Sequence, residues 1–366
     1  MKYYIIAGEA SGDLHGSNLI KKLKQQDKQS DIRCWGGDEM QEAGAVLVKH
    51  YRDLAFMGFV EVVKHLGTIF KNISFCKEDI TAYSPDVLVL IDYPGFNLRI
   101  AKWAKSQGIK VVYYISPQVW AWKENRVKII KQCVDKMLVI LPFEVDFYKK
   151  WNYPVIYTGH PLVEVVQQEK NEVHVESLSD KPIIALLPGS RKQEIQVKLP
   201  LMLEVVNDFP EYQFIVAQAP SLPDELFENI IGDKNVLLAK AQTYNLLKQA
   251  KAGLITSGTA TLETALFGLP QVVCYKGNAF SFWLATKLVK VKYISLVNLI
   301  MDKMVVKELI QNDLNKTNLI IELKKILQEG PALQSLRNDY VQLWSKLGDK
   351  PASATAAAEI IKVACP

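Results

Sequence analysis

The sequence predicts an α/β protein made of two Rossmann-like domains that face a cleft. Its 366 residues are too many for one typical domain and suggest two. Short, unbroken, β-branched apolar runs alternate with segments of helical period, as in parallel sheets whose strands are buried on both faces. This alternation begins again after a polar stretch, so the same architecture is expected twice.

The predicted strands fall into two groups separated by a linker. The first group occupies residues 3–7, 87–91, 110–115, 137–141 and 155–157, with helices expected at 16–25, 60–83 and 100–107. Residues 167–181 are polar and lack an apolar period, which is typical of a linker. The second group occupies residues 183–187, 213–217, 236–239, 253–256 and 271–275, and a helical pattern follows from Leu319 onward. We therefore expect domains at residues 1–166 and 167–366, with the last helix able to pack back on the first domain.

Composition and charge narrow the range of partners. With 49% hydrophobic and 23% charged residues, the chain is typical of globular proteins. The formal net charge of +5 fits an anionic substrate or an anionic membrane surface. Dense Lys/Arg blocks are absent from the sequence, which argues against a nucleic-acid partner.

Cysteine usage and hydropathy indicate the compartment. The five cysteines are scattered and form no CxxC pair, which is typical of a reducing cytosol and predicts no disulfide framework. The N-terminal apolar run is too short for a signal peptide. No run of about 18 apolar residues could span a membrane, so any membrane contact is expected to be peripheral.

Two loops of the first half follow predicted strands, where open α/β sheets bind ligands. Residues 8–13 (GEASGD) present backbone N–H groups at a helix N-terminus, or form a tight turn with Asp13 as the helix cap. Asp92 directly follows the strand at 87–91. Burial there could raise the pKa of its carboxyl toward that of a useful general base, although Asp92 could instead order the loop.

A third loop, residues 116–122 (SPQVWAW), is rich in aromatic residues and is followed by Lys123 and Arg126. Its two Trp side chains could stack on a sugar or cover acyl chains. They could equally pack two layers of the fold together, which is the more common use of aromatic side chains.

Two loops of the second half favour phosphate binding. Residues 187–191 (LPGSR) connect a strand to a helix that opens near Glu194, and Arg191 offers a forked donor, or is an exposed residue beside a helix cap. Residues 256–263 (TSGTATLE) present free N–H groups suited to a diphosphate, and Glu263 could bind the ribose hydroxyls. A structural capping box is the alternative, although Glu263 lies one position too late for one that starts at Thr259.

Metal and cofactor signals are absent from the sequence, and one apolar segment stands out. The five histidines lie far apart and no DxD-type acidic pair follows a strand, so we expect no metal and no cofactor. Residues 54–59, around Met57, are rich in Phe and Met and precede a helix with an apolar stripe. Such a stripe usually faces the core, but the segment also suits acyl chains or a bilayer surface.

Ten motifs taken together resemble those of the lipid-A-disaccharide synthases, which are inverting glycosyltransferases of the GT-B architecture. They are residues 8–13 (GEASGD), 57–62 (MGFVEV), 91–97 (IDYPGFN), 116–122 (SPQVWAW), 141–144 (LPFE), 159–161 (GHP), 187–191 (LPGSR), 257–263 (SGTATLE), 282–285 (FWLA) and 293–299 (YISLVNL). They run in order through most of the chain, and the ordered set is far more specific than any single motif.

The resemblance implies a reaction and its participants. UDP-2,3-diacylglucosamine would donate its sugar to 2,3-diacylglucosamine 1-phosphate, giving a β-1,6-linked lipid A disaccharide 1-phosphate and UDP without a metal. The reaction would take place on the cytoplasmic side, at the lipid surface of the inner membrane of a Gram-negative-type bacterium. The first domain would face the acceptor and the membrane, and the second would bind the UDP-sugar.

The resemblance also implies roles for particular residues. Asp92 would be the general base, with Glu9 and Ser11 beside it in the catalytic site. Asn298 and Met57 would contact the acceptor or the sugar. The residues expected to bind UDP are Ser190, Arg191, Glu194, Ser257, Gly258, Thr259 and Glu263.

Two other functions stay open on the residues. A UDP-N-acetylglucosamine 2-epimerase would share two Rossmann-like halves and a UDP site, but would not need a Phe/Met-rich surface. A non-catalytic UDP-sugar-binding or membrane-surface protein is the other alternative, and Asp92 at a strand end argues against it. The helical tail could also exchange between the protomers of a homodimer.

Overall fold

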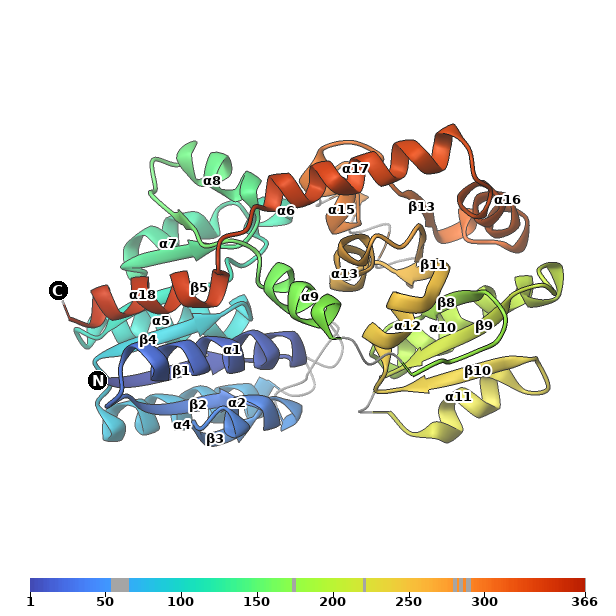
Figure 1. Ribbon diagram of the computed structural model, residues 1–366. Coiled ribbons are helices and arrows are strands. Elements are labelled where there is room, and N and C mark those ends of the chain that lie inside the picture. The colour runs from blue at the N-terminus through green and yellow to red at the C-terminus, as the bar shows by residue number, and fades with distance from the viewer. Residues whose placement is uncertain are drawn as a thin grey trace. The chain divides into compact units, whose positions relative to one another are not determined.

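The computed structural model describes residues 1–53, 66–172, 176–219, 222–278, 282, 286–287 and 291–365 (Figure 1). They form two compact units, one made of Met1–Pro161 with Asp349–Pro366 and the other of Leu162–Gly348. Each unit contains one sheet whose paired strands are all parallel. The predicted class of two parallel-sheet α/β domains is thereby confirmed.

The sheet of the first unit changes direction beside its first strand. Its order is β3-β2-β1-β4-β5-β6-β7, so the chain moves outward from β1 and then returns to β4 on the other side. Ala7 of β1 pairs with Ile91 of β4 at this switch point, where open α/β sheets bind ligands. The strands are β1 (Lys2–Ala7), β2 (Asp31–Gly36), β3 (Val46–His50), β4 (Val87–Ile91), β5 (Lys110–Tyr114), β6 (Lys136–Val139) and β7 (Ile156–Tyr157).

Helices cover both faces of this sheet. Successive strand residues point to opposite faces, and Tyr4, Ile6, Leu88 and Leu90 share one buried cluster with residues of α4, α5 and α7. On the other side, α18 lies beside α1 and contacts β4 and β5 (Figure 1). The helices are α1 (Ala10–Gln26), α2 (Asp38–Glu42), η1 (Tyr51–Asp53), α4 (Leu66–Tyr83), α5 (Pro94–Ser106), α6 (Val119–Trp122), α7 (Arg126–Cys133), α8 (Pro142–Lys149) and α18 (Ala352–Ala364).

The sheet of the second unit has the same kind of switch point. Its order is β10-β9-β8-β11-β12-β13, and Leu187 of β8 pairs with Ile255 of β11 where the order reverses. The strands are β8 (Ile183–Leu187), β9 (Gln213–Gln218), β10 (Val236–Lys240), β11 (Ala250–Thr256), β12 (Gln271–Tyr275) and β13 (Lys307–Ile310). The helices are α9 (Pro161–Asn171), α10 (Lys192–Met202), η2 (Leu203–Asp208), α11 (Asp224–Ile231), α12 (Thr243–Gln249), α13 (Thr259–Phe267), α15 (Leu296–Met301), η3 (Gln311–Asp313), α16 (Lys316–Leu327) and α17 (Pro331–Leu347).

The division between the units differs in detail from the predicted one. The first unit ends at Pro161, and helix α9 continues into the predicted linker as far as Asn171. This helix is tied to the second unit by the ion pair between Glu169 and Lys248, at 3.1 Å, and by Lys170 over the ring of Trp344. The last helix, α18, lies in the first unit, where Glu359 pairs with Lys136 at 2.8 Å.

Three strands are missing from the sequence-based prediction. In β2, Arg33 interrupts the apolar pattern because its guanidinium forms a bidentate pair with Asp79, at 2.6 and 2.9 Å. Strands β3 and β13 are edge strands and carry polar residues, so they do not read as unbroken apolar runs. Within the described residues, no helix is long and apolar enough to cross a bilayer.

Candidate functional site

Asp92 is held in an unusual backbone conformation at the carboxyl end of β4. Both Asp92 and Tyr93 lie in the left-handed region, with φ of 43° and 48°. Consecutive left-handed residues other than glycine are costly and need support from the surrounding structure. Here the carbonyl oxygen of Asp92 accepts hydrogen bonds from Tyr113 Oη and from Asn97 Nδ2, the latter at 2.8 Å. These bonds fix the backbone from which the carboxylate projects.

The surroundings of Asp92 make its carboxyl a candidate general base. Burial, and after it the nearby negative charge of Glu9, together raise the pKa of Asp92 to about 7, while a backbone hydrogen bond from Tyr93 acts in the opposite direction. Glu9 lies at the N-cap of α1, immediately after β1, and the pairing of β1 with β4 brings the two carboxylates together. A base with a pKa near 7 can accept a proton at neutral pH.

Tyr93 packs tightly against the loop after β1. A Cβ atom on Gly8 would lie 2.3 Å from Cγ of Tyr93, so no larger residue fits at Gly8 without displacing the ring. Ser11 is exposed in the first turn of α1. The structure therefore brings Glu9, Ser11 and Asp92, the three expected catalytic residues, to one edge of the first sheet.

Asp13, in contrast, has a structural role in the neighbouring loop. Its carboxylate accepts hydrogen bonds from the backbone N–H groups of Gly37, Met40 and Glu39, at 2.7, 3.1 and 3.2 Å. Asp13 therefore caps α2, whereas the alternative in which it caps its own helix does not hold, because Glu9 occupies that cap position.

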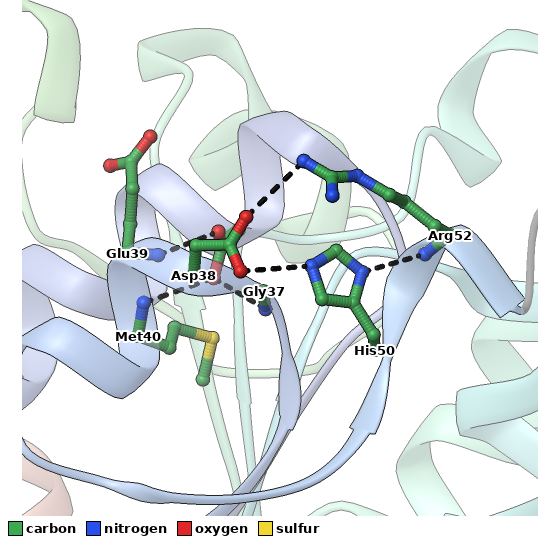
Figure 2. Close-up of polar contacts among 7 residues, drawn as sticks. Gly37, Asp38, Glu39, Met40, His50 and Arg52 are labelled. Atoms are coloured by element: carbon green, nitrogen blue, oxygen red, sulfur yellow. Dashed lines mark hydrogen bonds and ion pairs between the residues drawn. The ribbon is translucent and has the colours of Figure 1, made fainter. Parts of the chain in front are cut away.

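The loops around α2 are tied together by further polar contacts (Figure 2). Asp38 forms an ion pair with Arg52 at 3.2 Å and lies 3.5 Å from His50 Nε2. The backbone N–H of Arg52 donates to His50 Nδ1 at 3.1 Å. This network orders the carboxyl ends of β2 and β3.

A cavity of about 220 Å³ lies beside Asp92 and includes the aromatic loop predicted from the sequence. Its lining residues are Asp92, Pro94, Pro117, Gln118, Val119, Trp122 and Arg126. The two Trp residues of the loop serve different purposes. Trp122 lines the cavity, whereas Trp120 packs edge-on against Phe143 and donates from Nε1 to Glu144 Oε1 at 3.2 Å.

Glu144 is a buried carboxyl that the sequence analysis did not single out. Its other oxygen accepts from the backbone N–H of Leu141 at 3.0 Å, so it links the start of α8 to Trp120 of the cavity loop. Burial raises the pKa of Glu144 to about 8, and hydrogen bonds from Leu141, Ser116 and Trp120 oppose that rise. The available signal was the Glu three residues after Leu141, which is the spacing of a capping box.

In the second unit, the loop after β8 places Arg191 at a helix N-terminus. Gly189 has φ of 120°, a backbone conformation that favours glycine, and a Cβ atom there would displace the carboxylate of Glu194, whose Oε2 would lie 2.2 Å away. Arg191 is the N-cap of α10 and its Nη1 lies 3.4 Å from Glu194 Oε1. Ser190 is exposed beside it. This arrangement places a guanidinium at a helix N-terminus.

The loop after β11 forms the second helix N-terminus at this switch point. Gly258 is the N-cap of α13 with φ of 147°, so Thr259 is the first helical residue and not the cap. Ser257 Oγ donates to the carbonyl of Ile294 at 2.9 Å. Glu263 accepts from Tyr244 Oη at 3.2 Å, and burial raises the pKa of Glu263.

Lys198 connects these two loops and was also missed by the sequence analysis. Its Nζ donates to Thr256 Oγ1 at the end of β11 and lies 3.9 Å from Glu194 Oε2. The side chain is buried, and this burial lowers the pKa of Lys198 while Glu194 acts in the opposite direction. The signal in the sequence was the i,i+4 spacing of Glu194 and Lys198. A buried ammonium group at this position adds positive charge where a diphosphate is expected.

Asn298 is fully occupied by hydrogen bonds within the second unit. Its Nδ2 donates to the Val306 carbonyl and to Glu308 Oε1, at 2.8 and 2.9 Å. Its Oδ1 accepts from the N–H groups of Val305 and Val306, at 2.8 and 2.9 Å. These four bonds use the full capacity of the amide, so a sugar hydroxyl would have to displace one of them. In this structure Asn298 orders the segment around α15.

Met57 lies outside the described residues, as does the apolar segment around it. Among the residues that the structure does describe, no group of three His, Cys, Asp or Glu side chains could hold a metal ion. The expected UDP-binding residues gather at the switch point of the second sheet, except that Glu263 lies further along α13. The expected catalytic residues gather at that of the first sheet.

Solved structures with the same fold define the class. The UDP-GlcNAc 2-epimerase of Neisseria meningitidis bound to UDP-GlcNAc has a TM-score of 0.69 at 12% identity, covering 99% of this chain and 100% of that one. The calicheamicin glycosyltransferase CalG4 has a TM-score of 0.62 at 16% identity, covering 99% and 97%. The fold is therefore the one shared by GT-B glycosyltransferases and UDP-GlcNAc 2-epimerases. At this identity the likeness concerns the fold alone and does not choose between the two chemistries.

The sequence relatives distinguish between a glycosyltransferase and an epimerase. The lipid-A-disaccharide synthetase family matches residues 3–361. The lipid-A-disaccharide synthase of Geobacter metallireducens is 37% identical over 371 residues, covering 98% of this chain and 96% of the relative. That of Nitrosococcus oceani is 39% identical over 355 residues, covering 94% and 92%. The chain belongs to the lipid-A-disaccharide synthase family of glycosyltransferases, which confirms the resemblance drawn from its motifs.

Proposed function

We propose that this enzyme transfers 2,3-diacylglucosamine from UDP to the 6-hydroxyl of 2,3-diacylglucosamine 1-phosphate. The acceptor oxygen attacks the anomeric carbon, the bond from that carbon to the UDP oxygen breaks, and Asp92 takes the hydroxyl proton. The products are lipid A disaccharide 1-phosphate and UDP. The observation that carries the proposal is the position of Asp92 at a sheet switch point, with a pKa of about 7.

The second unit supplies the groups suited to the leaving UDP. The α10 and α13 N-termini follow adjacent strands, and Arg191 and Lys198 add positive charge there. Helix N–H groups and cations stabilise the negative charge that develops on a departing diphosphate. We propose that these groups serve in place of a metal, so excess chelator is expected to leave the rate unchanged.

The test is incubation with both acylated sugars, followed by mass analysis for a disaccharide phosphate and assay of released UDP. UDP-GlcNAc alone serves as a second reaction, because UDP-GlcNAc 2-epimerases share the fold. A disaccharide phosphate is the expected product. Epimerised UDP-GlcNAc without any disaccharide would overturn the proposal in favour of the alternative. Peripheral attachment to the inner membrane and formation of a homodimer are further parts of this proposal.

A further inference from the structure

A second cavity adjoins the one that contains Asp92. Its volume is about 390 Å³, and it shares Pro94 and Arg126 with the first cavity. Most of its wall is apolar, formed by side chains of α4, α5 and α7, and the charged residues among them are both arginines. The lining residues are Ile69, Tyr93, Pro94, Gly95, Phe96, Leu98, Arg99, Arg126 and Ile129.

The positive charges around this cavity have no carboxylate partner among the described residues. Arg99 and Arg126 both line the cavity. Burial lowers the pKa of Arg126, and the nearby positive charge of Arg99 lowers it further by a smaller amount. Lys123 lies close to Arg126 as well, and both cations sit over the ring of Trp122, at 4.1 Å for Lys123 and 5.7 Å for Arg126. Like charges held near one another in a partly buried place are unfavourable unless an anion joins them.

We propose that Arg126, with Arg99 and Lys123 nearby, binds the phosphate of the acceptor while the apolar wall of the larger cavity receives one of its acyl chains. This inference rests on the proposed function and names a subsite for it. An anion beside apolar surface matches a phosphorylated amphiphile, and Arg binds phosphate through paired N–H donors. Because Arg126 also lines the cavity of Asp92, a molecule held there extends toward the proposed base.

The test compares two acceptors in three proteins. The acceptors are 2,3-diacylglucosamine 1-phosphate and the same diacylglucosamine without its phosphate. The proteins are the wild type, Arg126→Gln and Lys128→Gln, in which the control changes an exposed cation of the same helix outside both cavities. Loss of a charge-assisted contact is expected to lower kcat/KM for the phosphorylated acceptor by about 10- to 100-fold, mainly through KM. The activity with the dephosphorylated acceptor and the affinity for UDP should change little. A fourth protein, Arg126→Lys, should retain part of the activity that Arg126→Gln loses.

Two further measurements are needed. Vesicle sedimentation distinguishes the acceptor phosphate from a lipid headgroup, and calorimetry distinguishes failure of the phosphate site from failure of the proposed function. Sedimentation with phosphatidylglycerol vesicles should be equal for wild type and Arg126→Gln. If it falls in the variant while the preference for the phosphorylated acceptor persists, the site binds lipid headgroups and the inference is overturned. If the wild type forms no disaccharide, the proposed function fails. Direct calorimetric binding of the phosphorylated acceptor, lost only in Arg126→Gln, would still support the phosphate site, and equal binding in both proteins would remove it.

Discussion

Glu9 and Asp92 end adjacent parallel strands, and the charge of Glu9 adds to the burial that raises the pKa of Asp92 to about 7. Two carboxyl groups near each other disfavour simultaneous ionisation, so the group in the more buried place keeps its proton to a higher pH. This relationship gives Asp92 a basicity suited to proton transfer at neutral pH.

Asp92→Asn is expected to lower kcat by about 10²- to 10⁴-fold, the range for removal of a general base. Asn suits the substitution because it matches Asp in shape and also tolerates left-handed backbone, which Asp92 adopts. UDP affinity, measured by calorimetry, should stay the same, because the residues proposed to bind UDP lie in the second unit. Asp146→Asn is the control, since that carboxylate is exposed on α8. Near-normal turnover of Asp92→Asn would make Glu9 the next candidate base.

The rate should depend on pH through the same carboxyl. A general base must be deprotonated, so kcat/KM is expected to fall as the pH drops below about 7. Glu9→Gln removes a negative charge that raises the pKa of Asp92, so this variant should show its acid limb at lower pH. Rate profiles from pH 5 to 9 test the shift. An unchanged acid limb in Glu9→Gln would show that another group controls it.

Arg191→Ala is expected to weaken UDP binding by about 1–3 kcal/mol, the scale for loss of a charge-assisted hydrogen bond. Arg191 lies at the N-cap of α10, where its charge and the free N–H groups both favour phosphate. Calorimetric titration with UDP measures the effect, and Lys192→Ala is the matched control, as Lys192 is the next, exposed residue. Equal UDP affinity in folded Arg191→Ala would exclude this contact.

Glu144→Ala should reduce both stability and activity. It leaves Trp120 Nε1 and the Leu141 N–H without their acceptor, at a cost of about 1–3 kcal/mol for each buried group, and it frees the loop that lines the Asp92 cavity. Glu144→Gln retains one acceptor oxygen and should be milder.

The pH dependence of unfolding tests the raised pKa of Glu144. Its pKa is raised on folding to about 8, so the folded protein holds a proton that the unfolded chain releases, and stability falls as pH rises toward 8. Glu144→Gln lacks this effect. The difference in unfolding free energy between Glu144→Gln and the wild type should therefore grow in favour of the variant by up to about 1.4 kcal/mol per pH unit between pH 5 and 8. Urea unfolding measures this difference. The same difference in unfolding free energy between the two proteins at pH 5 and at pH 8 would contradict the raised pKa of Glu144.

Membrane attachment is predicted to depend on the apolar segment around Met57. Changing Met57→Ser together with Phe59→Ser should reduce sedimentation with liposomes, and should lower activity on long-acyl acceptors more than on short-acyl ones. Lys residues beside the segment predict weaker attachment at high salt. Lys346→Ser, at an exposed position of α17, is the control. If the double variant folds, sediments normally and has the same activity on both acceptors, these residues do not bind the membrane. If it fails to fold, they belong to the core.

The sequence by itself determined the two parallel sheets and the loops worth testing. Unbroken β-branched runs identify buried strands, and Gly, Ser and Asp directly after them mark loops at the carboxyl ends, so residues 8–13, Asp92 and residues 187–191 could be selected without coordinates. Both features are local in the chain. Edge strands β3 and β13 were not predicted, because half-exposed strands carry polar residues and lack that local pattern.

Only the tertiary structure decided what the selected side chains do. It paired Ala7 with Ile91, which placed Glu9 beside Asp92, and it buried Lys198 against Thr256, which lies 58 residues further along the chain. It also satisfied all the hydrogen-bonding capacity of the Asn298 amide with partners in the same unit. The charge state and the free hydrogen-bonding capacity of a group depend on burial and on neighbours from distant segments, and these are set by packing rather than by local sequence.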